Sequence, residues 1–261
     1  LIDFDFLSQD EMNNAPCFLL DPLHAKRYWD GNPRGQQKPQ LQFWTSRGCP
    51  FRCIFCVWPA TMTGNDPDGK GKRRVRFYDP AKIDESLRYL IDRYHFRTVY
   101  FDDDTFNLKD EHVLAVCDVM RRIGVPWSAM CRADTISLGT WQKMKESGCF
   151  GVKIGFESGN QEVLDKIVNK RLNLDRARDV VHELKAMGFV IHGTFTLGLP
   201  GETEEQMMDT LAYLSSLPLD SYQVSGTAVL EGTPLHSLRN GKALEKYPKA
   251  TLEASFMDEK D

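Results

Sequence analysis

The feature that most constrains this sequence is a regular alternation of short apolar segments and longer segments with helical periodicity. The segments expected to form strands are residues 41–46, 97–102, 126–132, 151–158, 189–199 and 221–230. Between them, apolar residues recur at the three- and four-residue spacing of amphipathic helices, in the segments 79–94, 111–124, 137–148, 160–168, 174–188 and 202–217. Repeated strand–helix units with short connections form a parallel sheet with right-handed crossovers.

Six such units are too few for a standard eight-unit barrel. We therefore predict an α/β fold, a partial (βα)6 TIM-like barrel, that covers residues 41–235. Residues 1–40 contain four prolines and a turn-rich stretch, so we expect an irregular N-terminal extension that links or enters the domain. Residues 236–261 are expected to form a C-terminal tail.

Three of the seven cysteines lie within eight residues, directly after the first predicted strand. The stretch CPFRCIFC places Cys49, Cys53 and Cys56 at a C-x3-C-x2-C spacing. Functional sites of parallel α/β folds lie at the carboxyl ends of the strands, and three clustered thiolates there indicate a metal site. Three ligands suit a [4Fe-4S] cluster with one open iron. A structural zinc site is the alternative, but zinc requires a fourth ligand from a distant part of the chain.

Composition and charge restrict the location and the partners. The odd number of cysteines and the absence of a signal-peptide pattern favour a reducing, cytoplasmic location. Lys and Arg total 33 against 37 Asp and Glu, whereas proteins that bind nucleic-acid phosphates usually show a basic excess. No apolar run approaches the ~18 residues of a membrane helix. We therefore expect neither a nucleic-acid partner nor a membrane span.

The cysteine spacing resembles the signature of the radical S-adenosylmethionine (SAM) superfamily, and the likeness extends over roughly residues 41–235. The motifs RGCPFRCIFC, FDDDTF, GFESGNQEVLDKI, LGLPGET and EGTPL most resemble the cobalamin-dependent branch. This resemblance implies an enzyme in which a reduced [4Fe-4S] cluster cleaves SAM to a 5′-deoxyadenosyl radical, which abstracts hydrogen from an unactivated carbon. It further implies methyl transfer with cobalamin as a third cofactor. Radical rearrangement, carbon–carbon coupling or cyclisation without methyl transfer is an alternative, as is a non-enzymatic zinc or iron–sulfur module.

The resemblance also implies which residues contact SAM. They lie in the cysteine loop or at the carboxyl ends of the predicted strands: Phe55, Asp102, Asp103, Asp104, Arg132, Glu157, Ser158, Gly198 and Glu202. The aromatic residue is expected near the adenine, the backbone of the aspartate segment near the SAM amino group, and the arginine near the SAM carboxylate. The pair in GFESG is expected at the ribose or the amino group, and the residues of GLPGET at the adenine.

Partners follow from the same resemblance. A radical SAM enzyme of this branch implies a small-molecule or lipid substrate and an external electron donor. Such proteins usually carry a cobalamin-binding domain before the radical SAM domain. This sequence contains no D-x-H-x-x-G motif, with which many such domains ligate cobalt, and it begins without Met. We therefore expect that an N-terminal cobalamin-binding domain belongs to the full protein and is absent from this chain.

Overall fold

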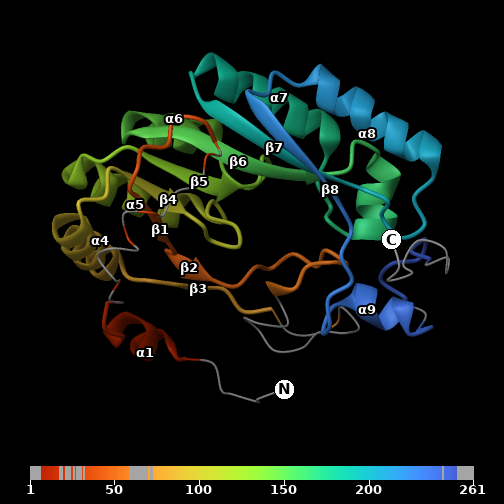
Figure 1. The fold of residues 1–261 in the computed structure, drawn as a ribbon, viewed down its shortest axis with the longest axis horizontal. Coiled ribbons are helices and arrows are strands. Elements are labelled where there is room, and N and C mark those ends of the chain that lie inside the picture. Colours follow the sequence, from red (N-terminus) through yellow and green to blue (C-terminus); the bar gives the residue numbers. More distant parts are fainter. Residues whose placement is uncertain are drawn as a thin grey trace.

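The computed structural model describes residues 7–17, 20, 25, 27, 31, 33–58, 70, 73–242 and 244–251. Within them, six strands form one sheet in the order β1-β4-β5-β6-β7-β8, and all neighbouring strands are parallel (Figure 1). These strands are β1 (Gln40–Phe43), β4 (Thr98–Phe101), β5 (Trp127–Cys131), β6 (Cys149–Glu157), β7 (Val190–Leu197) and β8 (Ser221–Gly226). The sequential order confirms the predicted partial (βα)6 barrel, with β1 and β8 at its two ends.

Helices cover the outer face of this curved sheet (Figure 1). They are α4 (Pro80–Tyr94), α5 (Asp110–Ile123), α6 (Leu138–Glu146), α7 (Leu174–Ala186) and α8 (Glu204–Ser216). Each lies within two residues of its predicted range. The segment after β6 differs from the prediction, because most of it is a short π-helix, η1 (Val163–Val168). Its wider turns require i→i+5 hydrogen bonds, which a helical pattern in the sequence does not distinguish from α-helix.

The main hydrophobic core lies between the sheet and the helices. Phe101, Phe106 and Trp127 pack with ring centroids 5.2, 5.3 and 5.6 Å apart. On the next units along, Trp141 of α6 packs edge-on against Phe189, with centroids 6.1 Å apart. All five side chains are buried, so the apolar periodicity of the sequence corresponds to one continuous core.

The N-terminal extension closes the amino ends of the strands. The side chain of Gln36 donates to Ser128 of β5, and Gln37 exchanges hydrogen bonds with the Thr98 hydroxyl of β4. A Cβ atom on Gly151 of β6 would lie 2.8 Å from the Pro33 ring and 2.9 Å from a backbone carbonyl, so this close approach requires glycine. The described part of the N-terminal extension therefore covers the amino ends of β4, β5 and β6.

The prediction that residues 1–40 are irregular is wrong for one segment, because residues Gln9–Asn14 form the short helix α1. Ser8 and Glu11 form a capping box, in which each side chain binds the other residue's backbone N–H. Asn13 exchanges two hydrogen bonds with Asp79. Asp79 occupies the N-cap position of α4, but its side chain makes no capping bond.

A small antiparallel sheet flanks the cysteine loop and was not predicted. It consists of β2 (Ser46–Arg47) and β3 (Arg76–Phe77). Two-residue strands carry no periodic signal, so the sequence offers no basis for finding them. The pairing ties the residues just before Cys49 to the segment just before α4.

A second, smaller core lies beside the barrel and beneath the middle of the cysteine loop. It contains buried residues from the loop, η1, the end of β7, helix α9 (Pro234–Arg239) and residues 244–250. Its members are Ile54, Val163, Ile167, Val168, Leu199, Leu235, Leu244, Tyr247 and Ala250. The region that we predicted as a C-terminal tail thus contributes three side chains to this core.

None of the helices in the part of the chain described above is long and apolar enough to cross a membrane.

Candidate active site at the carboxyl ends of the strands

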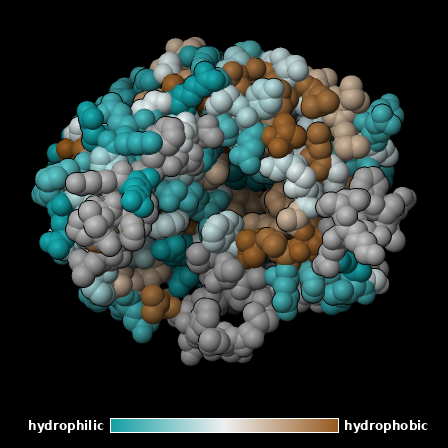
Figure 2. Space-filling view, viewed as in Figure 1, coloured by the Kyte–Doolittle hydropathy of each residue, from teal (hydrophilic) through white to brown (hydrophobic). Residues whose placement is uncertain are grey.

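A cavity of about 220 Å³ lies between the cysteine loop and the carboxyl ends of β4, β5 and β6. The space-filling view shows the molecule hollowed near its middle (Figure 2). The cavity is lined by most of the predicted site residues, namely Cys49, Cys53, Phe55, Cys56, Asp102, Asp103, Asp104, Arg132 and Glu157. The fold therefore gathers into one place residues that are separated by more than a hundred positions in the sequence.

The three thiols of the cysteine loop are held in a partly desolvated environment. Burial raises the pKa of the Cys53 thiol to about 11 and raises that of Cys56 further. Cys49 lies 3.6 Å from the hydroxyl oxygen of Thr105. A bound metal deprotonates coordinating thiols, so metal binding here releases protons. Among the described residues, no group of His, Cys, Asp and Glu has the arrangement of a site for a single metal ion.

The start of the cysteine loop is fixed by the aspartates that follow β4. Asp103 is buried and accepts hydrogen bonds from the backbone and hydroxyl of Thr45 and from the hydroxyl of Ser46. Asp104 accepts the backbone N–H of Gly48 at 2.9 Å. Gly48 has a φ of 97°, which favours glycine. These carboxylates therefore bind the protein's own N–H and hydroxyl groups, and the contact of this segment's backbone with SAM remains a prediction.

A histidine that we did not select completes this network. The Thr45 hydroxyl donates to Asp103, so the Nε2 of His112, 2.8 Å from the same hydroxyl, is the donor to Thr45. Burial raises the pKa of Asp103 to about 6 and lowers that of His112 to about 4. Both shifts have the same cause, because burial disfavours the charged form of either group.

An ion pair lies on the opposite wall of the cavity. The Glu157 carboxylate accepts a hydrogen bond from Lys170 at 2.8 Å and another from Thr196 at 3.3 Å. The side chains of Glu157 and Lys170 are 16% and 7% exposed. A carboxylate on a buried strand needs such a partner, so the ion pair explains how the sequence tolerates a charge there.

The backbone directs both members of this pair into the cavity. Glu157 has a φ of 68°, next to a register shift between β6 and β7. Lys170 follows η1 and lies between two residues with positive φ, Asn169 and Arg171. Left-handed conformations at non-glycine residues cost free energy and tend to occur at functional sites. The local strain coincides with the two side chains that provide the charges of this wall.

Arg132 lies at the same edge but is already paired. Its guanidinium makes two hydrogen bonds of 2.9 Å to Asp134 and stacks over the ring of Phe51, 3.7 Å from the ring centroid. One further N–H reaches the backbone carbonyl of Lys170 at 3.3 Å. The bidentate geometry that we expected for the SAM carboxylate is thus used by an internal carboxylate.

Three predicted residues lie outside the cavity lining. Ser158, directly after β6, is buried, and its hydroxyl lies 3.0 Å from that of Thr210 of α8. Gly198 and Glu202 belong to the turn after β7, where the Glu202 carboxylate accepts the backbone N–H of Leu199 at 3.0 Å. Burial raises the pKa of Glu202.

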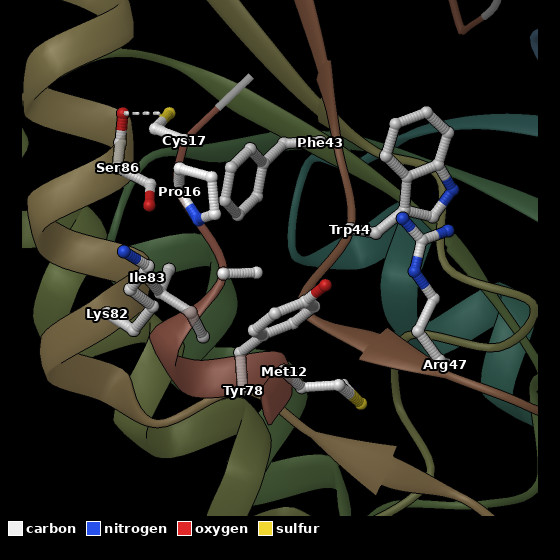
Figure 3. Close-up of a pocket in the computed structure, with 11 residues that line it drawn as sticks. Met12, Pro16, Cys17, Phe43, Trp44, Arg47, Tyr78, Lys82, Ile83 and Ser86 are labelled. Carbon is white, nitrogen blue, oxygen red and sulfur yellow. Dashed lines mark hydrogen bonds between the residues drawn. The ribbon is translucent and has the colours of Figure 1, made fainter. Parts of the chain in front are cut away.

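A second cavity, of about 100 Å³, lies under α1 (Figure 3). Its walls are mainly apolar and include Met12, Phe43 and Tyr78. At one side Arg47 stacks on Trp44, with the guanidinium 4.8 Å from the ring centroid. None of the predicted site residues lines it, so the larger cavity is the candidate active site.

The comparison with protein families matches the part of the chain that contains most residues of this site. The profile of the radical SAM superfamily matches residues 45–214, from just before the cysteine loop into α8. This chain belongs to the radical SAM superfamily. It is a radical SAM enzyme by family, and the members of this family use a [4Fe-4S] cluster and SAM. The family assignment favours the iron–sulfur cluster over the zinc alternative.

Several relatives of this radical SAM chain are methyltransferases by name. An uncharacterized methyltransferase of Pyrococcus horikoshii is 30% identical over 193 residues, which cover 73% of this chain and 40% of the relative. The cytidylyl-2-hydroxyethylphosphonate methyltransferase of Streptomyces wedmorensis is 30% identical over 205 residues, 74% of this chain and 36% of the relative. This chain therefore spans less than half the length of these two relatives.

Solved structures show that the fold is shared. The radical SAM methyltransferase TsrM from Kitasatospora setae, determined with cobalamin and a [4Fe-4S] cluster bound, superposes with a TM-score of 0.65 at 19% identity. The match covers 77% of this chain and 36% of that one.

The sequence analysis missed four residues that shape the site. Lys170 and Asp134 neutralise Glu157 and Arg132, and Thr105 contacts the first cysteine. Phe51 covers the arginine. Phe51 and Thr105 lie within motifs that were recognised, and this position was their only signal in the sequence. The lysine lies thirteen residues beyond its partner, and no spacing rule predicts that separation.

The buried Asp103–Thr45–His112 network predicts opposite pH dependences of stability for two variants. The folded pKa of Asp103 lies above its ordinary value, so this group destabilises the protein as pH rises from about 4 to 6. The folded pKa of His112 lies below its ordinary value, so the contribution of this group to the unfolding free energy increases as pH rises from about 4 to 6.5. Relative to wild type, the unfolding free energy of Asp103→Asn should rise across this window and that of His112→Gln should fall.

Between pH 4.5 and pH 7 each difference should be on the order of 2 kcal/mol, because this interval covers most of the pKa shift of each group. Urea unfolding at pH 4.5 and 7 measures it, and wild type should vary less because the two effects oppose each other. Parallel pH profiles for wild type and both variants would show that the pKa values of these two groups are the same in the folded and unfolded states.

Proposed function

We propose that the cavity at the strand ends binds a [4Fe-4S] cluster through Cys49, Cys53 and Cys56, with SAM beside it. The observation that carries this proposal is the convergence of three thiols and two buried charge pairs on one cavity. When bound, the cluster and SAM supply a 5′-deoxyadenosyl radical for hydrogen abstraction from an unactivated carbon. The described residues bind, orient and shield these groups.

The donor set fits a cluster better than a single zinc ion. In a cubane each cysteine binds a different iron atom, so its three thiolates lie farther apart than the ligands of one tetrahedral ion. The three thiols line one cavity, whereas a tetrahedral zinc ion would need a fourth protein ligand in addition to them. Three protein ligands would also leave one iron open, as a cofactor-binding site requires.

The Glu157–Lys170 pair suits the methionine part of SAM, which carries both an ammonium and a carboxylate group. Glu157 could accept hydrogen bonds from the ammonium or the ribose hydroxyls, and Lys170 could donate to the carboxylate. We assign this role to Lys170 ahead of Arg132, because Asp134 already holds the guanidinium. Phe55 lies in the cysteine loop at the cavity wall and provides an apolar surface for the adenine.

We propose further that the full protein transfers a methyl group with the help of cobalamin. Support comes from the methyltransferase names of the relatives and from the fold shared with TsrM. Cobalamin, when bound, would supply a methyl group suited to a carbon radical, whereas the SAM sulfonium donates methyl to nucleophiles. The protein would act on a small-molecule or lipid substrate, take electrons from an external donor, and work in the cytoplasm, where thiols stay reduced.

Replacement of the loop cysteines tests the cluster. Cys49→Ala, Cys53→Ala or Cys56→Ala should each remove most bound iron and all reductive SAM cleavage after anaerobic reconstitution. Cys117→Ala is the matched control, because Cys117 is buried on α5 outside the cavity, and it should retain about four iron and four sulfide per chain. Normal iron content in Cys53→Ala would contradict the assignment.

Calorimetry tests the role of the ion pair in SAM binding. Glu157→Gln keeps the shape but removes the charge, so SAM should bind about tenfold more weakly or worse while the cluster remains. Lys170→Met should have a similar effect. Glu162→Gln is the control, since that glutamate forms exposed ion pairs with Lys166 and Lys249. SAM affinities equal to the control in both site variants would remove this pair from the SAM site.

Product analysis of the full-length protein separates methyl transfer from the other radical reactions. A cobalamin-dependent methylase should convert SAM to both S-adenosylhomocysteine and 5′-deoxyadenosine and pass a labelled methyl group to its product. Turnover that yields 5′-deoxyadenosine without S-adenosylhomocysteine would instead support rearrangement, coupling or cyclisation.

A further inference from the structure

The segment Asp103–Thr105 makes contacts that SAM binding does not explain. The two aspartates hold the backbone from Thr45 to Gly48, and the next residue, Thr105, reaches the sulfur of Cys49. Three consecutive residues after β4 therefore fix the entry to the cysteine loop and contact its first thiol.

The contact of Thr105 with Cys49 is sheltered and well positioned. Thr105 is only 4% exposed, and its hydroxyl oxygen lies 3.6 Å from the cysteine sulfur, within hydrogen-bond range for sulfur. The bond from Gly48 to Asp104 ties the residues that immediately precede these two partners, so the Thr105–Cys49 distance is set by the backbone on both sides. Such preorganisation is what an interaction with a bound group requires.

The single proton of this hydroxyl has two possible acceptors. In the thiol form, Cys49 can donate its own proton to Thr105, and the hydroxyl proton is then directed to the carbonyl of Asp104, 2.6 Å away. A thiolate has no proton to donate and carries negative charge, which makes it a stronger acceptor than a neutral carbonyl. Rotation of the hydroxyl hydrogen alone, without movement of heavy atoms, then directs the bond to sulfur.

We propose that Thr105 is a positioning residue that donates a hydrogen bond to the Cys49 thiolate and thereby raises the reduction potential of the cluster. The inference rests on the proposed cluster site. Hydrogen bonds to the ligating sulfurs are among the factors that set the potential of an iron–sulfur cluster. A donor withdraws electron density from the sulfur, which stabilises the reduced cluster and eases its reduction by the electron donor.

Cys56 provides a comparison within the same loop. Its sulfur interacts with the backbone N–H of Trp58, a donor that substitution of the side chain does not remove. The donor to Cys49 is a side-chain hydroxyl, so the two effects can be separated. The role of Thr105 can therefore be tested without changing any cluster ligand.

The test is a redox titration of the reconstituted protein, followed by the EPR signal of the reduced cluster. Thr105→Val removes the hydroxyl at nearly constant volume, and its midpoint potential should shift to a more negative value at unchanged iron and sulfide content. Thr105→Ser keeps the hydroxyl and should restore the wild-type potential. Thr140→Val is the control, because that threonine is equally buried but bonds to Asp110, away from the loop.

Each outcome has one interpretation. A wild-type potential in Thr105→Val overturns the tuning role. If Thr105→Val and Thr105→Ala both lose the cluster while Thr105→Ser retains it, the hydroxyl serves cluster retention, and the tuning role is likewise overturned. Wild-type protein that binds no iron or sulfide would instead refute the proposed cluster site itself.

Discussion

The burial of Ile54 between Cys53 and Cys56 is the contact on which the candidate site most depends. Ile54 is fully buried in the second core, its N–H binds the carbonyl of Val168, and its carbonyl accepts the N–H of Leu235. The hydroxyl of Tyr247 also binds the loop at Arg52. Cys53 and Phe55 pack against the same core, so the elements that bury Ile54 also fix the shape of the middle of the loop.

Charge neutralisation is the second constraint on the cavity. Glu157 is paired with Lys170 and Arg132 with Asp134, while Asp103 is surrounded by hydroxyl and N–H donors. Unpaired charges at such burial would be costly. The cavity can therefore present strong hydrogen-bonding groups to a polar cofactor while the protein without its cofactors remains folded.

Sequence reasoning predicted regular elements well and contacts less well. The strands and most helices follow from apolar periodicity, which depends only on local sequence. The π-helix, α1 and the β2–β3 pair lack such a signal, because they are short and depend on partners distant in the chain. Lys170 is the clearest example: it lies beside Glu157 between two residues with positive φ, Asn169 and Arg171, and no residue pattern indicates these conformations.

The sequence by itself determined the parallel barrel, its radical SAM family and the three cysteines of the loop. Strand spacing fixes the first, and a motif of eight residues carries the other two. Only the tertiary structure decided which charged residues face the cavity and which bind each other. Arg132, Asp103 and Ser158 were predicted near SAM, and in the structure their side chains bind Asp134, Thr45 and Thr210; their contacts with SAM remain a prediction. The reason is physical: a motif gives the type of a side chain, whereas its partner is chosen by burial and by the groups that folding brings within reach.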